Sequence, residues 1–511
     1  MSDGGVTIGR VYLVGAGPGA AGLITLRGVE CLRRADVVMY DYLVNPRLLA
    51  HVRAGAERIG LGGQGGSRAW PQEEVTSRMI ELARSGATVV RLKAGDPAVF
   101  ARCAEEAEAL HEHGIPFEIV PGITAGLAAA SCAGVPITHR ELASAVALIT
   151  GHEVRGKGAP RLDYASLAGF PGTLVFYMGV TTAGIWSSGL VRAGKPPDTP
   201  AVIIRRCSLP DQRTVHCTLG EVADRLAPAT ELRPPVIVIV GRAAAMAHAL
   251  SWFERRPLFG RTVMVTRPAD ESWSLAEMLE EQGANAVLQP AIAVRPPDDW
   301  GPVDDAIGRM SEFDWVVFSS VNGVRALLDR VEAVGRDLRV LGPVRLAAIG
   351  PATAAELAKY RLRADRQPST YQAERLAEAL AGDAARNRFL LVRASRGRDV
   401  LARQLEAAGG RVTQVVAYRS IDVPTPDEQV ADQLRGGLVD WVTVTSSAIA
   451  RSLAAMFGDD LRRARLVSIS PLTSGTLHEL GFTPSAEATE ATMEGVVAAI
   501  VAAERKAGAT Q

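Results

Sequence analysis

The C-terminal half of the chain repeats itself with an offset of 126 positions, so its fold must contain two similar parts. The segment LAEMLEEQG at 275–283 matches LARQLEAAG at 401–409, and Asp314-Trp315-Val316 matches Asp440-Trp441-Val442. Each copy alternates short β-branched runs with amphipathic helical patterns, which is typical of parallel α/β units with helices on both faces of a sheet. We therefore expect two similar α/β lobes that face a cleft.

The first 125 residues contain three predicted strands that open into loops rich in glycine and proline. These loops are Gly15-Ala16-Gly17-Pro18-Gly19, Ala94-Gly95-Asp96-Pro97 and Pro121-Gly122-Ile123-Thr124-Ala125. Glycine lets the backbone approach a ligand closely, and open parallel sheets bind ligands at the carboxyl ends of their strands. The three loops are therefore the candidate ligand site of the N-terminal half.

The composition limits the partners that the chain can have. Its 511 residues are 47% hydrophobic and 22% charged, which leaves room for several domains, and 56 basic residues balance 56 acidic ones. A net charge of zero gives no global basic field for nucleic acid, and we find neither a signal peptide nor an apolar run of about 18 residues. We expect small-molecule partners, no nucleic acid, no membrane and a cytoplasmic location.

The five cysteines lack CxxC spacing, so they predict buried thiols rather than disulfides or a zinc site, and we expect no metal.

A charged segment with proline and glycine at Trp252 to Gly260 marks the domain boundary. The expected domains are 9–250 and 260–505 with a linker at 251–259, lobe one being 260–295 plus 420–505 and lobe two 296–419.

The first glycine loop has a second interpretation. Gly15 to Ala20 also satisfies the G-x-G-x-x-A pattern of dinucleotide-binding folds, with Asp41 at about the right distance, and alone it favours neither reading. A nicotinamide site has no need of the two later loops. A folded S-adenosylmethionine, in contrast, could be enclosed by several backbone turns.

Longer segments carry a family resemblance. In chain order, VYLVGAGPGAAGLITLRG, VVMYDYLV, PQEE, VVRLKAGDPAVF, GIPFEIVPGITA and TLVFYMGV resemble the uroporphyrinogen-III C-methyltransferases of the tetrapyrrole methylase family over about 10–250. The segments DWVVFSS, AAIGPAT, LLVRASRGRDVL and VVAYRS resemble uroporphyrinogen-III synthase over 258–505. The resemblance implies a two-subdomain tetrapyrrole methylase fold followed by a two-lobed, internally duplicated parallel α/β synthase fold.

The implied activity is bifunctional. The synthase half would cyclise hydroxymethylbilane to uroporphyrinogen III with inversion of one ring. The methylase half would then methylate this product twice to precorrin-2, for sirohaem or cobalamin synthesis. Methylases of this type are usually dimeric, so the resemblance also implies a homodimer through the first half.

The implied methyl donor is S-adenosyl-L-methionine, held largely by main chain. The positions that match the family's cofactor contacts are Gly17, Pro18, Ala94, Gly95, Asp96, Val99, Thr124, Ala125, Met178 and Cys207. Asp41 stands where the family places a proton acceptor, although an aspartate there could also simply form a turn. Relatives carry a proton-donating lysine where this chain has Gly63. We expect an active methylase, the alternative being an active synthase with a non-catalytic or altered methylase half.

A substrate with many carboxylates requires a basic or polar lining in both halves. The candidates are Arg91, His139 and Arg140 in the first half, and Arg267, Ser320, Thr353, Arg393, Ser446 and Thr473 in the second. Tyr418 matches the tyrosine of the family's VVAYR segment, and its repeat mate is Ile292. A polar group on only one of two matched strands suggests a function other than packing. Tyr418 is therefore the candidate acid that protonates the hydroxyl lost from hydroxymethylbilane. The alternative is a tyrosine that only covers the end of a strand.

Overall fold

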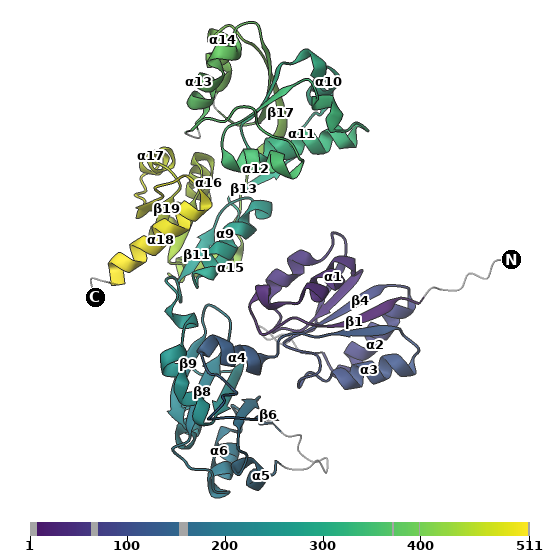
Figure 1. The fold of residues 1–511 in the computed structure, drawn as a ribbon, viewed down its shortest axis with the longest axis vertical. Helices are drawn as coiled ribbons and strands as arrows, with labels where there is room; N and C mark the ends of the chain where they lie inside the picture. Colours follow the sequence, from purple (N-terminus) through teal and green to yellow (C-terminus); the bar gives the residue numbers. More distant parts are fainter. Residues whose placement is uncertain (1–7, 63–69, 153–161, 370–371, 398, 509–511) are drawn as a thin grey trace, which may run out of the picture. The chain divides into compact units, whose positions relative to one another are not determined.

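The computed structural model describes residues 8–62, 70–152, 162–369, 372–397 and 399–508. Gly63 therefore lies outside the described residues. The chain divides into two units: unit 1 comprises 1–261 with 280–285, and unit 2 comprises 262–279 with 286–511. Within the described residues the strands form four five-stranded sheets, two in each unit (Figure 1).

The first sheet of unit 1 is entirely parallel. Its strands are β1 (Arg10–Gly15), β2 (Val37–Tyr40), β3 (Glu57–Gly60), β4 (Thr88–Lys93) and β5 (Phe117–Val120), with helices α1 (Leu26–Arg34), α2 (Gln72–Arg84), α3 (Cys103–Glu112) and α4 (Ala125–Ala133). The strand order is β3-β2-β4-β1-β5. Because β4 is flanked by β1 and β2, the loops and turns that follow these three strands meet at one edge of the sheet.

The second sheet of unit 1 is mixed. Its strands are β6 (Val146–Thr150), β7 (Thr173–Tyr177), β8 (Pro200–Arg205), β9 (Arg213–Thr218) and β10 (Val236–Val240), with helices α5 (Tyr164–Ala168), α6 (Ala183–Arg192), α7 (Val222–Arg225) and α8 (Ala247–Leu250). The order is β6-β7-β10-β8-β9, with only β6 and β7 parallel. Trp186 stacks on Phe176 in its core with ring centroids 4.0 Å apart. Two α/β subdomains in the first half are confirmed.

Lobe one of unit 2 is built on a parallel sheet of order β12-β11-β18-β19-β20. The strands are β11 (Thr262–Val265), β12 (Asn285–Leu288), β18 (Trp441–Val444), β19 (Arg465–Ser468) and β20 (Ala486–Glu487), with helices α9 (Ala269–Glu281), α15 (Glu428–Arg435), α16 (Ser447–Phe457), α17 (Pro471–Glu479) and α18 (Met493–Gly508). Both the first strand of unit 2, β11, and its last helix, α18, belong to lobe one.

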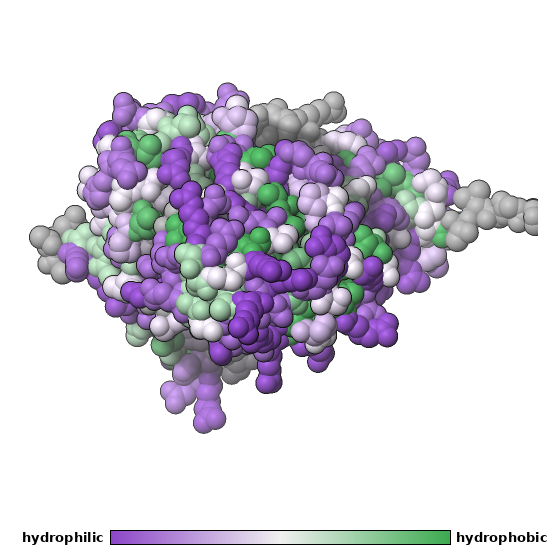
Figure 2. Space-filling model, turned by 90° about the horizontal axis from the view of Figure 1, so that it is seen from above, coloured by the Kyte–Doolittle hydropathy of each residue, from purple (hydrophilic) through white to green (hydrophobic). Residues whose placement is uncertain are grey.

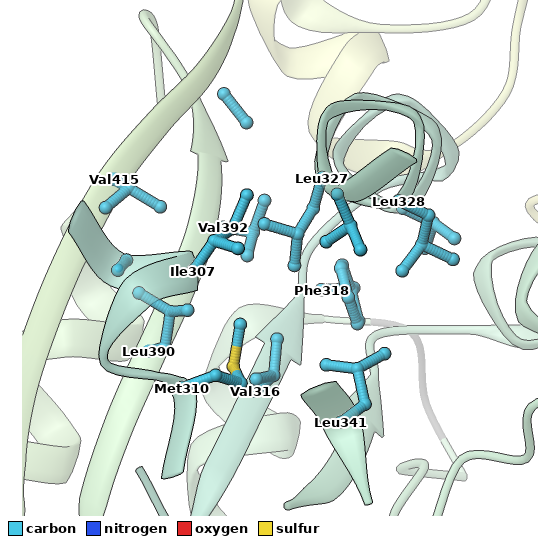
Figure 3. Close-up of a cluster of buried hydrophobic side chains, with 14 of the residues drawn as sticks. Ile307, Met310, Val316, Phe318, Leu327, Leu328, Leu341, Leu390, Val392 and Val415 are labelled. Carbon is cyan, nitrogen blue, oxygen red and sulfur yellow. The ribbon is translucent and has the colours of Figure 1, made fainter. Parts of the chain in front are cut away.

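Lobe two has the strand order β13-β17-β16-β14-β15. The strands are β13 (Ile292–Arg295), β14 (Trp315–Phe318), β15 (Arg345–Ala348), β16 (Arg388–Ala394) and β17 (Arg411–Asp422), with helices α10 (Gly301–Gly308), α11 (Val321–Ala333), α12 (Pro351–Lys359), α13 (Ala373–Ala384) and α14 (Val400–Ala407). Figure 3 shows its core, where Phe318 of β14 lies beside Leu327 and Leu328 of α11, and Val316 of the same strand lies next to Met310. These buried aliphatic contacts hold the helix against the sheet.

The sequence repeat maps one lobe onto the other. An offset of 126 residues carries β12 and β11 onto β17 and β16, and carries β14 onto β18, so four strands have the same order in both sheets. The fifth strand lies at opposite ends, with β20 next to β19 in lobe one and β13 next to β17 in lobe two. Each lobe combines the first part of one copy with the second part of the other. The duplicated, two-lobed α/β fold that we predicted is therefore confirmed.

An antiparallel ribbon lies where the chain passes between the lobes. β13 pairs with the end of β17, with Ile292 opposite Asp422 and Arg295 opposite Arg419. The lobe limit expected at 295/296 coincides with the end of β13, whereas the limit expected at 419/420 falls inside β17, because β17 continues as one strand past the end of its repeat match. Residues 292–295 and 420–422 belong to the sheet of lobe two.

Among the described helices, none combines the length and apolar character that crossing a bilayer requires. On the face drawn in Figure 2, hydrophilic residues predominate and hydrophobic ones form small separate groups. All five cysteines are free; Cys217 is partly buried and the others are buried, as the sequence predicted.

Candidate functional site

The first two glycine loops of unit 1 are hydrogen-bonded to each other. Gly17 N donates to Gly95 O at 3.2 Å, and Gly95 N donates to Gly17 O at 2.8 Å. Both residues have left-handed backbones, with φ of 79° at Gly17 and 73° at Gly95, which other residues adopt only at a cost. Two of the predicted cofactor positions are thus brought together by main chain alone.

The third loop packs against the first two. Gly122 N donates to Asp96 Oδ2 at 2.9 Å, and Ala98 N donates to Asp96 Oδ1 at 2.8 Å, so this carboxylate ties two loops together. A Cβ on Gly122 would lie 2.2 Å from Gly95 O and 2.8 Å from the Cα of Gly15. Backbone therefore meets backbone at Gly15 and Gly122, two positions that our residue predictions missed although both stand at strand ends.

A buried tyrosine supports the beginning of α4. The hydroxyl of Tyr177 lies 2.9 Å from Thr124 Oγ1 and accepts a hydrogen bond from Gly126 N at 2.9 Å. Cys207 Sγ contacts Ala125 O at 3.7 Å, and burial raises the pKa of the Cys207 thiol to about 12, so it stays a neutral thiol. Val99 packs against the same apolar cluster as Cys207. Thr124, Ala125, Val99 and Cys207 are thus neighbours, and Tyr177 is a further residue that the sequence analysis missed.

The remaining predicted cofactor positions border this cluster along the chain. Pro18 and Ala94 are partly buried within their loops. Met178 follows Tyr177 directly, is 51% exposed and has a φ of 51°. Phe100, with a φ of 52°, places its ring 5.0 Å from that of Tyr177. Left-handed backbone at residues other than glycine is costly and concentrates at functional sites.

The chemistry of the three loops fits a sulfonium cofactor. Residues 15–19, 94–99 and 121–125 contain no lysine or arginine, and their one charged side chain is Asp96. Backbone carbonyls and a carboxylate favour a nearby positive charge, and a cationic side chain would disfavour it. The close glycine contacts leave backbone atoms, rather than side chains, to form the surface.

Asp41 belongs to a buried ionic network. It follows β2 at the same sheet edge as the glycine loops, and Arg91 Nη2 donates to its Oδ1 at 2.6 Å. Arg91 Nε lies 3.2 Å from Glu106 Oε1, and Lys93 Nζ lies 2.7 Å from Glu106 Oε2. Burial, together with the neighbouring Arg91 charge, lowers the pKa of Lys93. Arg91, which we expected to contact substrate, is instead buried and engaged by two carboxylates.

Unit 2 contains a cavity of about 550 Å³ lined by both lobes. Arg267, Tyr418 and Ser446, all predicted from the sequence, line it. Glu271 and Asn322 line it as well, and Glu271 was not among our candidates because one acidic residue in a helix pattern carries no signal of its own.

Tyr418 is buried in this cavity and bonded to a serine of the other repeat copy. Its hydroxyl lies 2.9 Å from Ser320 Oγ, which also accepts from Gly323 N at 3.0 Å at the beginning of α11. Burial raises the pKa of Tyr418, and the charge of Glu271 raises it further. The phenol is therefore protonated at neutral pH and can donate a proton. Its repeat mate Ile292 also lines the cavity.

Comparisons with known proteins agree with this geometry. Residues 10–223 match the family described as Tetrapyrrole (Corrin/Porphyrin) Methylases, and residues 274–498 match Uroporphyrinogen-III synthase HemD. The Porphyrin biosynthesis protein HemD of Ruminiclostridium josui is 34% identical over 452 residues, which cover 88% of this chain and 89% of that protein. The chain belongs to these two families.

We now call unit 1 the methylase domain and unit 2 the synthase domain, after the two families that they match. The Uroporphyrinogen-III C-methyltransferase of Bacillus subtilis (strain 168) is 39% identical over 352 residues, covering 69% of this chain and 71% of that protein. A solved structure of Uroporphyrin-III C-methyl transferase from Thermus thermophilus, complexed with S-adenyl homocysteine, is 41% identical, with a TM-score of 0.40, and covers 46% of this chain and 99% of that chain. The two family matches and the Ruminiclostridium josui relative identify the protein as a bifunctional enzyme of tetrapyrrole biosynthesis.

Two predicted substrate contacts of the methylase domain lie in the loop after α4. His139 is partly buried, and its N donates to Ala143 O at 2.9 Å, whereas Arg140 is exposed. Among the contacts of the described residues, none joins either side chain to Asp41. Their part in substrate binding stays a prediction.

The other predicted polar residues of the synthase domain lie at the beginnings of helices or in an ion pair. Thr353 and Thr473 are buried in the first turns of α12 and α17, and Ser446 accepts from Ile449 N at 3.2 Å at the beginning of α16. Arg393 pairs with Asp399 and donates to Gln414 Oε1 at 2.7 Å. Of these, only Ser446 also lines the cavity within the described part of the chain. No group of three or more histidine, cysteine or acidic side chains suited to a metal is found among the residues described.

Proposed function

We propose that this chain converts hydroxymethylbilane to uroporphyrinogen III in its synthase domain and then methylates that product twice in its methylase domain, giving precorrin-2 for sirohaem or cobalamin synthesis. The observation that carries the proposal is the set of three interlocked glycine loops at the same sheet edge as Asp41. The two reactions are consecutive, because the product of the first is the substrate of the second.

In the methylase domain, S-adenosyl-L-methionine supplies an electrophilic methyl group. The pyrrole carbon that receives it is already electron-rich, so alignment by Gly17, Gly95 and the loop after β5 contributes most of the rate. After transfer the ring must lose a proton. Asp41 accepts it at the carboxylate that Arg91 holds in place.

In the synthase domain, Tyr418 donates its proton to the oxygen that leaves hydroxymethylbilane. The Ser320 hydroxyl, 2.9 Å away, orients the phenol for this step. The cavity shields the resulting cation from water while the last ring is inverted and the macrocycle closes. Arg267 and the amide of Asn322 offer partners for substrate carboxylates.

The deciding experiment incubates the purified chain with hydroxymethylbilane, with and without labelled S-adenosyl-L-methionine. We expect uroporphyrinogen III first and then doubly labelled precorrin-2. Type III product without label would favour the alternative, a synthase whose methylase domain does not turn over. Absence of the type III isomer above the spontaneous type I background would refute the synthase assignment.

Gly63 is the reason to test that alternative, because the family resemblance implies a lysine at this position. A Gly63→Lys variant tests it directly by its rate of methyl transfer. A large rise in rate would mean that the wild-type domain lacks a needed proton donor. An unchanged rate would mean that alignment and Asp41 suffice.

We also propose a homodimer through the methylase domain, in a cytoplasmic protein with the domain limits given above. The edge strand β5 exposes Phe117 by 36% and Ile119 by 44%, which leaves apolar side chains for a partner to cover. Light scattering on the eluting protein should give twice the chain mass, and a monomer at all concentrations would contradict the proposal.

A further inference from the structure

Glu271 places a negative charge in a cavity that, on the function proposed above, must accept a polycarboxylate. It lies on α9 of lobe one, and its side chain is 16% exposed. Its Oε1 accepts a hydrogen bond from Asn322 Nδ2 at 2.6 Å, and Asn322 lies on α11 of lobe two. Its Oε2 is paired with Arg267 Nη2. One carboxylate therefore joins the two lobes and neutralises a cation of the cavity.

The duplicated fold provides an internal comparison for this contact. The repeat mates of Glu271 and Asn322 are Gly397 and Ala448, which line the same cavity and have no polar side chains. The mate of Arg267 is Arg393, which pairs with Asp399 within lobe two. The contact exists at one of two equivalent places, so the duplicated scaffold does not require it.

A second acidic side chain of the cavity, Asp422 on β17 of lobe two, also interacts with lobe one, through Ser452 and Arg451 on α16. Arg396 and Asp422, 2.8 Å apart, both belong to lobe two. Arg267, in contrast, has a buried Nε without a hydrogen-bond partner among the described residues, and its Nη2 is occupied by Glu271. An incoming carboxylate that bonds to both Nε and Nη2 of Arg267 would compete with Glu271 for Nη2.

We propose that Glu271 is a latch of the empty synthase cleft, holding Asn322 and Arg267 until a substrate carboxylate displaces it. The latch has two separable parts, a hydrogen bond between the lobes and a negative charge on Arg267. The latch holds the two lobes together when no substrate is bound, and it lowers the affinity for substrate because the substrate must displace it. This rests on the proposed synthase function only for the identity of the displacing carboxylate.

The first test measures the distance between the lobes in the substrate-free full chain. Spin labels on Glu332→Cys in lobe two and Glu494→Cys in lobe one, both exposed positions, report it in a Cys217→Ser background. Asn322→Ala and Glu271→Ala should broaden the distance distribution or shift it to longer values, whereas Glu271→Gln keeps an acceptor for Asn322 and should leave it unchanged. Distributions in both alanine variants that equal the wild type would overturn the latch.

The second test measures KM for hydroxymethylbilane. Glu271→Gln removes the competing charge and should lower KM on the order of fivefold, the usual strength of one partly exposed ion pair. Glu277→Gln, at an exposed position of the same helix, is the matched control and should change neither readout. A KM in Glu271→Gln that equals or exceeds the wild-type value would also overturn the proposal. If the wild type forms no type III product, the synthase assignment fails, and the distance measurement alone decides whether the lobes are latched.

Discussion

Arg91 and Asp41 are joined by a hydrogen bond of 2.6 Å between Nη2 and Oδ1. The arginine is buried, and the aspartate lies where the sheet edge meets the glycine loops. A guanidinium is planar and rigid, so it fixes the direction in which the carboxylate points. The methylase domain thus holds its candidate base in place with a buried arginine.

Asp41→Asn should lower the rate of methyl transfer roughly a hundredfold to ten-thousandfold, the usual contribution of a positioned base. The amide keeps the shape of the side chain but cannot take the proton. Calorimetry should show S-adenosylhomocysteine binding as in the wild type, because the interlocked loops do not include residue 41. A rate close to that of the wild type would remove Asp41 from the mechanism.

Glu106→Gln should destabilise the methylase domain by about 3–5 kcal/mol, because Lys93 and Arg91 would remain buried without their shared counter-charge. Urea unfolding followed by fluorescence measures this loss. The matched control is Glu105→Gln, whose exposed pair with Arg102 should cost no more than about 1 kcal/mol. Equal losses in the two variants would mean that the buried network adds nothing to stability.

Gly122→Ala should weaken S-adenosylmethionine binding roughly tenfold or more, because the new Cβ would meet Gly95 O at 2.2 Å and force the loops apart. Gly22→Ala is the control, since no atom lies within 4 Å of the Cβ that it adds. Titration calorimetry compares both variants with the wild type. Unchanged affinity in Gly122→Ala would show that the loops do not form the cofactor surface.

Tyr418→Phe should slow cyclisation roughly a hundredfold or more, because the proton donor is lost. The active form is the protonated phenol, so activity should be present below the pKa of Tyr418 and lost as pH rises through it. Because burial raises that pKa, the loss should come only above about pH 10. Tyr360→Phe, which removes a hydroxyl bonded to Asp329 at 3.0 Å in the same lobe, should retain wild-type rates. A Tyr418→Phe enzyme with normal turnover would exclude the proton role.

The sequence predicted the architecture well because a duplication and the transitions from strand to loop are both visible as patterns along the chain. Gly17 and Gly95 were found at strand ends, and their left-handed backbones explain why glycine stands there. Tyr418 was found because it matches the tyrosine of the VVAYR segment of the family that the chain resembles, and because its repeat mate Ile292 is apolar. In these cases the signal lies in residues that neighbour or match one another along the chain.

Long-range partners account for what the sequence analysis missed. Arg91 reads as a free cation until Glu106, which lies on the next helix, is placed beside it. Thr353 and Thr473 were candidates for the substrate lining, but they are buried in the first turns of helices that begin at Pro351 and Pro471. The role proposed for Glu271 depends on its hydrogen bond with Asn322, which lies 51 positions away in the sequence.

The ribbon between β13 and β17 has a consequence for how the synthase domain could be assembled and exchanged. Ile292 and Asp422 sit opposite each other, so the intervening lobe leaves and re-enters its host at adjacent points. Lobe two is therefore an insertion in lobe one, with its two ends adjacent. We expect that it could be removed and the two ends joined by a short linker, or that it could be replaced by the equivalent lobe of a homologue. Exchange of this lobe would then vary the substrate cleft while the rest of the chain stays intact.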